Sequence, residues 1–136
     1  MEEGDKKSVR ILIISGAVCG CFSVLLGAMG AHALKNHLNE SQLNSFETGV
    51  RFLFFHGLTL LLISALRSYF SSRQLRMLQN LFVSGILFFS VSIFLLSTKS
   101  LTGLDWIASF AWITPVGGLL LMAGWFLFFL FSFKSK

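Results

Sequence analysis

The chain alternates between four long apolar blocks and short polar segments. The blocks run over residues 11–31, 50–66, 78–98 and 115–133. An α-helix rises about 1.5 Å per residue, so about 20 apolar residues cross the roughly 30 Å hydrocarbon core of a bilayer. The pattern therefore predicts an all-α fold: an integral membrane four-helix transmembrane bundle with short interfacial segments, forming a single membrane domain over residues 1–136.

Two of the blocks are preceded by signals for a helix start. Asn39 followed three residues later by Gln42 predicts a capping box at the start of the helix that leads into the second span. Thr114 offers an N-cap oxygen before the fourth span. Pro115 suits the first helical position because its missing N–H costs nothing there. We therefore expect the fourth helix to begin at Pro115.

The segment between the third and fourth spans is too short to cross a bilayer. It covers residues 101–111 and carries Asp105 and Trp106, with Trp112 just beyond. Tryptophan is enriched at the headgroup layer because its ring is apolar and its N–H is polar. We expect this segment to lie along the membrane surface.

The distribution of charged residues predicts the orientation of the helices in the membrane. The chain is 54% hydrophobic and 12% charged, below the roughly 25% charge of soluble domains. Its net charge of +5 does not predict a nucleic-acid partner, because the Lys and Arg residues lie at the ends of the apolar blocks. Four spans place eight cations on one side, against Lys35, Arg51 and Lys99 on the other. The eight are Lys6, Lys7, Arg10, Arg67, Arg73, Arg76, Lys134 and Lys136. The positive-inside rule then predicts cytoplasmic N- and C-termini.

Small residues mark the faces on which the helices should pack. Helices in lipid gain little from the hydrophobic effect, so close backbone approach across small side chains supplies packing energy. The first span carries a stripe at helical spacing, and the fourth has two glycines a heptad apart: Gly16, Gly20, Ser23, Gly27 and Gly30, then Gly117 and Gly124. We expect the stripe to face another helix of the bundle or, alternatively, to form a homodimer seam. Gly20→Leu should then disrupt folding more than Phe128→Leu.

Four ionisable side chains gather around the junction of the first two spans: His32, Glu47, Arg51 and His56. Glu47 precedes Arg51 by four residues, a spacing that favours an ion pair on one helix face. The structural interpretation is that Glu47 pairs with Arg51 and that the histidines bond locally. The functional interpretation is a proton, ion or ligand site, because ionisable groups at membrane depth often mark one.

Other chemistry finds little support in the sequence. A bis-histidine haem would need His32 and His56 at one depth, and they are expected to differ by about 10 Å along the membrane normal. The chain has no HExxH, CxxC or phosphate-binding glycine loop. We therefore expect no catalytic residue, metal or cofactor, and no enzyme activity.

Three motifs resemble a known family. They are GAMGAHAL at residues 27–34, FETGVRFLFFHGLTLLL at 46–62 and TPVGGLLLMAGW at 114–125. Together they make the chain similar to domain-of-unknown-function family 423, which includes YgdD-like bacterial proteins and the mitochondrial transmembrane protein 256. The resemblance implies a four-helix protein of the bacterial inner membrane, with the mitochondrial inner membrane as the alternative, and no inherited catalytic role. Met29 and Phe52 stand where many relatives are expected to have Phe and Tyr.

These observations favour a structural or accessory protein of the lipid bilayer, either a self-contained bundle or one docked on a larger membrane complex or a homo-oligomer. The alternative is a small transporter or channel that uses Glu47, Arg51 and His56. A transport path needs polar residues at the bilayer midplane from several helices, whereas the third and fourth spans offer mainly serines and glycines.

Overall fold

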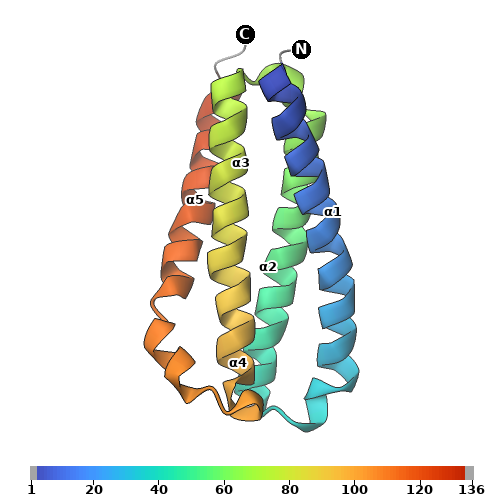
Figure 1. The fold of residues 1–136 in the computed structure, drawn as a ribbon, viewed down its shortest axis with the longest axis vertical. Helices are drawn as coiled ribbons and strands as arrows, with labels where there is room; N and C mark the ends of the chain where they lie inside the picture. Colours follow the sequence, from blue (N-terminus) through green and yellow to red (C-terminus); the bar gives the residue numbers. More distant parts are fainter. Residues whose placement is uncertain (1–2, 134–136) are drawn as a thin grey trace.

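The computed structural model of the chain describes residues 3–133. Its α-helices are α1 (Glu3–His32), α2 (Glu40–Ala65), α3 (Ser72–Ile86), α4 (Ser92–Thr102) and α5 (Ile113–Ser132). Shorter helical segments are η1 (Leu34–Asn36), η2 (Arg67–Tyr69), η3 (Leu87–Val91) and η4 (Asp105–Phe110). A π-helical turn, η3, joins α3 to α4, so these three segments form one rod (Figure 1). Within the described residues, four helical segments are long and apolar enough to cross a membrane, which confirms the predicted all-α membrane fold.

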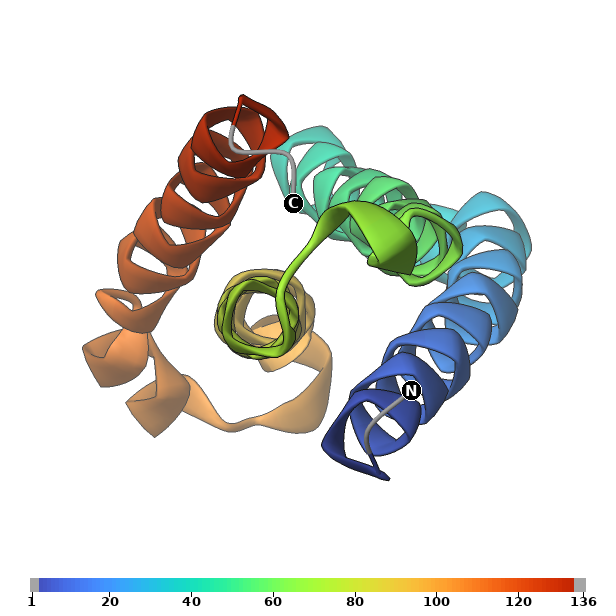
Figure 2. The ribbon, with the colours of Figure 1, turned by 90° about the horizontal axis from the view of Figure 1, so that it is seen from above.

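The helices form two packed pairs, and the rod that contains α3 belongs to the second pair and lies at the centre of the bundle (Figure 2). α1 packs on α2, and α5 packs on α3 and η3. Seen along the bundle, α3 lies in the middle with α5 on one side and α1 and α2 on the other (Figure 2). The start of α1 and the end of α5 lie at the same end of the bundle (Figure 1). Lys134 and Lys136, which contribute to the predicted charge asymmetry, lie outside the described residues.

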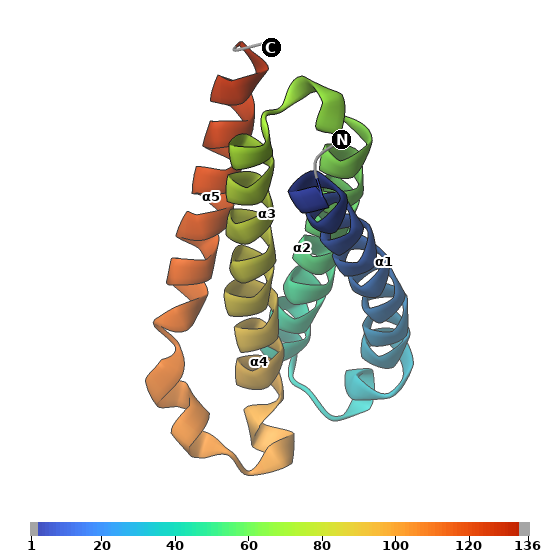
Figure 3. The same ribbon diagram turned by 45° about the horizontal axis from the view of Figure 1, so that its top comes forward.

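The first pair meets where two glycine backbones approach each other, and Figure 3 shows α1 crossing α2. A Cβ added at Gly16 would lie 2.8 Å from the carbonyl oxygen of Gly57, and one added at Gly57 would lie 2.7 Å from the Cβ of Cys19. A Cβ added at Gly20 would meet no neighbour within 4 Å. The expectation that Gly20 is needed for close packing is therefore wrong, because its missing side chain points into open space.

The rest of the predicted stripe in α1 is less tightly packed than Gly16. Ser23 is buried, and its hydroxyl donates to the carbonyl of Cys19 in its own helix. Added Cβ atoms at Gly27 and Gly30 would make ordinary contacts of 3.7 Å with Val50 and 3.4 Å with Phe46. The stripe faces α2, and only its Gly16 end requires glycine.

In the second pair, α3 and α5, glycines bring one helix against the backbone of its neighbour. A Cβ added at Gly117 would lie 2.7 Å from the backbone carbonyl carbon of Phe88, and one at Gly85 would lie 3.1 Å from the backbone nitrogen of Leu121. At Gly124 the neighbour is the ring of Phe82, 3.1 Å away. The π-helical turn η3 therefore sits directly against α5 at Gly117.

The helix ends agree with the sequence at one place and differ at another. Asn39 and Gln42 form the predicted capping box. The prediction that Thr114 caps α5 is wrong, because α5 begins at Ile113 and the Thr114 hydroxyl lies 2.7 Å from that of Ser92. Pro115 still costs no hydrogen bond, because the first four N–H groups of a helix have no partner within the helix.

The connection between α4 and α5 has the form expected of an interfacial segment. α4 ends at Thr102 and is followed by Gly103, whose φ of 67° is the left-handed conformation that glycine adopts without strain. The short helix η4 follows, and Trp106 within it and Trp112 just after it are exposed. Exposed tryptophans at this end of the bundle are suited to a headgroup layer.

Candidate polar site

The structure divides the four predicted site residues between two places. Glu47 and Arg51 lie on α2 beside α1, where both line a groove between the two helices. His32 is exposed at the last position of α1. His56 lies deeper along α2 and is buried, with 7% of its surface exposed. The four residues therefore do not form one cluster. Glu47 and Arg51 are exposed beside α1, His32 is exposed at the end of α1, and His56 is buried in the core.

His56 bonds through both ring nitrogens. Its Nδ1 lies 2.8 Å from the carbonyl oxygen of Phe52, and the indole N–H of Trp125 donates to Nε2 over 3.3 Å. An indole nitrogen can only donate, so Nε2 must carry a lone pair and the proton must be on Nδ1, which donates to Phe52. His56 is thus a neutral imidazole that links α2 to α5, and neither nitrogen is left to bind a metal or a haem.

Aromatic rings surround this histidine. Phe52 stacks on it with ring centroids 5.5 Å apart, and the Phe82 ring lies 6.0 Å away. Phe82 in turn meets Trp125 edge to face at 5.6 Å, and Phe52 lies 4.4 Å from Phe89 of η3. These rings come from α2, α3, η3 and α5, so they join the two helix pairs. The arrangement fits a packing role for His56.

Glu47 and Arg51 do not form the expected ion pair. The guanidinium of Arg51 donates to the hydroxyl of Thr48 over 3.2 Å, and among the described residues no ion pair joins it to Glu47. Both side chains are exposed. In water a pair at this spacing gains only about 0.3–0.5 kcal/mol, too little to fix two flexible side chains. The two charges therefore remain available to another group.

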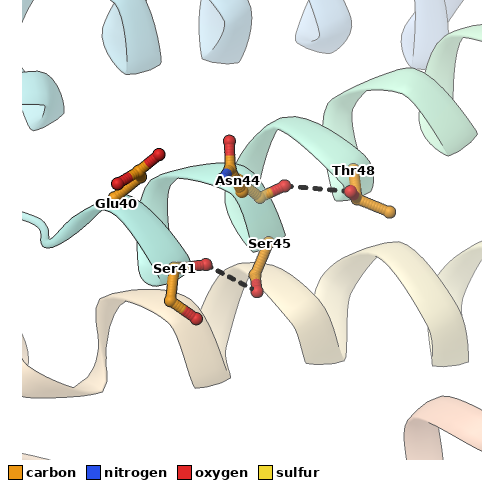
Figure 4. Close-up of a pocket in the computed structure, with 5 residues that line it drawn as sticks. All are labelled: Glu40, Ser41, Asn44, Ser45 and Thr48. Carbon is orange, nitrogen blue, oxygen red and sulfur yellow. Dashed lines mark hydrogen bonds between the residues drawn. The ribbon is translucent and has the colours of Figure 1, made fainter.

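A shallow polar hollow lies near the first turns of α2. Its lining is Glu40, Ser41, Asn44, Ser45 and Thr48 (Figure 4). The hydroxyl of Ser45 donates to the carbonyl of Ser41, and that of Thr48 donates to the carbonyl of Asn44, each over 2.9 Å. The Ser45 and Thr48 hydroxyls are therefore satisfied by their own helix. Over the described residues, no group of three His, Cys, Asp or Glu side chains is placed to hold a metal ion.

The sequence is similar to a family of bacterial membrane proteins. Residues 26–118 match the family described as "Protein of unknown function (DUF423)". The UPF0382 membrane protein SH2409 of Staphylococcus haemolyticus is 35% identical over 126 residues, which cover 93% of this chain and 98% of the relative. The chain belongs to the DUF423 family. No solved structure matches it.

Other relatives support the same assignment. The UPF0382 membrane protein of Haemophilus influenzae is 35% identical over 122 residues, 88% of this chain and 91% of the relative. YwdK of Bacillus subtilis is 30% identical over 118 residues, 86% of this chain and 91% of the relative. This DUF423 protein is thus a small bacterial membrane protein of several spans, as predicted, and the names of these relatives give no reaction or substrate.

Sequence reasoning missed two polar features of the spans, the hydrogen bond of Trp125 to His56 and the burial of Ser90. Trp125, the partner of His56, lies 69 residues away in the chain, and no local pattern links the two. Ser90 is fully buried in η3, and its hydroxyl has no hydrogen-bond partner among residues 3–133. A π-helical turn has no simple sequence signature, so the burial of Ser90 could not be predicted from spacing alone.

Proposed function

We propose that this DUF423 protein is a non-enzymatic accessory protein of the bacterial inner membrane, with cytoplasmic termini, which docks on a larger membrane complex. The observation that supports this proposal is the hydrogen bonding of the polar groups within its spans. Most of them bond to the helices themselves, which leaves helix faces for association and gives little polar surface for chemistry.

The hydroxyls within the spans donate mostly to their own backbone. Thr59 donates to the carbonyl of Phe55, Ser97 to that of Ile93 and Ser23 to that of Cys19. Such bonds satisfy the hydroxyl in lipid, where an unsatisfied polar group is costly. Together with the neutral, doubly bonded His56, they supply packing and orientation.

The exposed faces of the helices are strongly apolar. On α1 the exposed side chains include Phe22, Val24 and Leu25, and on α5 they include Leu119, Met122 and Phe126. Lipid solvates such faces, and helices of another membrane protein pack on them by van der Waals contact. α1 and α5 flank the central rod on opposite sides, so each offers a separate face to a partner (Figure 2).

Association with a partner is tested by gentle extraction. Membranes carrying the full-length, tagged protein are solubilised in a mild detergent, and the extract is separated by size and analysed by mass spectrometry. We expect recovery with a larger membrane protein in a fixed ratio. Recovery only as a free monomer, at every detergent concentration that keeps the helices folded, would contradict docking.

Transport is the second candidate, because Glu47 and Arg51 both line a groove. It is tested with proteoliposomes: a transporter would show a flux driven by pH or membrane potential that is lost in Glu47→Gln. We expect no such flux, since the neighbouring polar groups bond to their own helices.

Reporter tags at both ends test the proposed topology, and signals from opposite sides of the membrane would contradict it.

A further inference from the structure

The groove that holds Glu47 and Arg51 has the features of a lipid site. It lies between α1 and α2 on the half of the bundle away from the termini and has a volume of about 260 Å³. Its lining is Leu26, Gly27, Gly30, Ala31, Phe46, Glu47, Val50 and Arg51. All but the two charged residues are apolar or small, so the groove is an apolar trough with a charged rim.

The trough is open because α1 presents glycine there. Added Cβ atoms at Gly27 and Gly30 would stand against Val50 and Phe46 at ordinary contact distance, so these positions would accept a side chain without displacing α2. Glycine is thus not required here to bring the helices together, in contrast to Gly16. Its effect is to leave space along the wall of the groove.

The charges on the rim have a fixed order. Arg51 follows Glu47 by four residues, which is about 6 Å along the helix axis and closer to the middle of α2. Arg51 therefore lies deeper in the bilayer than Glu47. Its only hydrogen bond among the described residues is to Thr48, and Glu47 has no partner there. A guanidinium at the edge of the hydrocarbon layer favours an anion that can accept two parallel hydrogen bonds.

We propose that this groove binds a phospholipid whose headgroup carries both a phosphate and a primary amine. The phosphate lies next to the glycerol, at the depth of Arg51, and accepts hydrogen bonds from the guanidinium. The amine extends toward water and donates to the Glu47 carboxylate, while the upper part of an acyl chain lies along Val50 and the glycines. The order of charges along the groove thus matches the order of charges in the lipid.

The same geometry disfavours other headgroups. An anionic phospholipid without an amine would satisfy Arg51 but leave Glu47 without a cation. A choline headgroup carries a positive charge but no N–H to donate, so its contact with the carboxylate is weaker. The groove should therefore prefer phosphatidylethanolamine to both phosphatidylglycerol and phosphatidylcholine.

Native mass spectrometry of the full-length protein tests this preference. The protein, delipidated in detergent, is mixed with equal amounts of phosphatidylethanolamine, phosphatidylglycerol and phosphatidylcholine of identical chains. We expect ethanolamine adducts to exceed each of the others by about threefold, the ratio expected for one partly exposed ion pair. Glu47→Gln should remove the preference over phosphatidylglycerol while total lipid binding remains. Arg51→Gln should lower adducts of all three lipids.

Arg73→Gln is the matched control, because Arg73 is an exposed cation at the opposite end of the bundle. It should leave the preference for phosphatidylethanolamine unchanged. Glu47 makes no contact on which the fold depends, so Glu47→Gln keeps the test decisive even if Arg51→Gln fails to fold. Equal binding of the three lipids by the unmodified protein, or an unchanged preference in Glu47→Gln, would overturn the proposal. Neither result would bear on docking to a partner.

Discussion

The two helix pairs of this protein are held together in different ways. α1 and α2 approach most closely at Gly16, Gly57 and Cys19, whereas Gly20, Gly27 and Gly30 of α1 are less tightly packed. α5 meets the rod closely at Gly85, Gly117 and Gly124. Its Trp125 and Thr114 side chains hydrogen-bond to His56 of α2 and to Ser92 of α4. The α1–α2 interface is closest at the Gly16 end, and the groove lies at its other end, where it is lined by Gly27 and Gly30. The first pair therefore combines a close backbone contact with an open, charged groove, whereas close glycine contacts recur along the second pair from Gly117 to Gly124.

The largest loss of stability is expected for Gly117→Ala. The added Cβ would lie 2.7 Å from the Phe88 carbonyl carbon, and the backbone of η3 cannot move aside as a side chain can. We expect a loss of about 3 kcal/mol in the free energy of unfolding, near the upper end for overpacking. Reversible unfolding in mixed detergent and dodecyl sulfate micelles measures it.

The neighbouring glycine provides the control for this prediction. A Cβ added at Gly118 would lie 3.6 Å from the Phe89 ring, an ordinary contact. Gly118→Ala should therefore be neutral or slightly stabilising, because alanine favours helix more than glycine does. Equal losses in the two variants would show that the backbone contact at Gly117 is not what joins α5 to the central rod.

Gly16→Ala is the corresponding change in the first pair, with a smaller expected effect. The added Cβ meets the Leu61 side chain and the Gly57 carbonyl oxygen, and Leu61 can change its rotamer. We expect a loss of about 2 kcal/mol, measured by the same unfolding assay. Gly20→Ala, one turn along α1, should cost nothing. A loss in Gly20→Ala as large as in Gly16→Ala would restore the view that the whole stripe is packed.

These glycines show how far the sequence could predict the fold. Spacing identified the face of α1 that meets α2, because residues three and four apart share one side of a helix. Spacing could not show where two crossing helices touch, which depends on the angle between them. Gly20 was therefore given the same packing role as Gly16, although only Gly16 touches α2 closely, and Gly57 was not recognised as the partner of Gly16.

The candidate site was less predictable than the fold. Counting residues along the second span predicts Glu47 and Arg51 near the junction of the first two spans, and in the structure both line a groove beside α1. The expected ion pair between them is absent from the described residues, and Arg51 bonds to the Thr48 hydroxyl instead. A rule based on local spacing alone could not predict that competing bond. His56 lies apart from these two residues and bonds to Trp125 of α5. That contact joins residues far apart in the sequence, so no local pattern indicates it.

The hydrogen bond between Trp125 and His56 should contribute a smaller share of the stability. Trp125→Phe removes the indole N–H and leaves the buried Nε2 of His56 without a donor. Interhelical hydrogen bonds in membrane proteins couple by about 0.6–1.7 kcal/mol, and we expect about 1 kcal/mol from a double-mutant cycle with His56→Phe. Trp106→Phe, in the exposed η4 segment, is the control and should leave stability nearly unchanged. A coupling of zero would assign His56 to ring packing alone.

The smallest effect is expected where α5 begins. Thr114→Val keeps the shape of the side chain but removes the hydroxyl that lies 2.7 Å from Ser92. Because the Ser92 hydroxyl also donates to the Phe89 carbonyl, it remains satisfied after the change, and we expect a loss of only about 0.5 kcal/mol. Thr98→Val, which removes a bond within α4 alone, should cost less still. If Thr114→Val cost as much as Gly117→Ala, hydrogen bonding and not glycine contact would be the main link between α5 and the central rod.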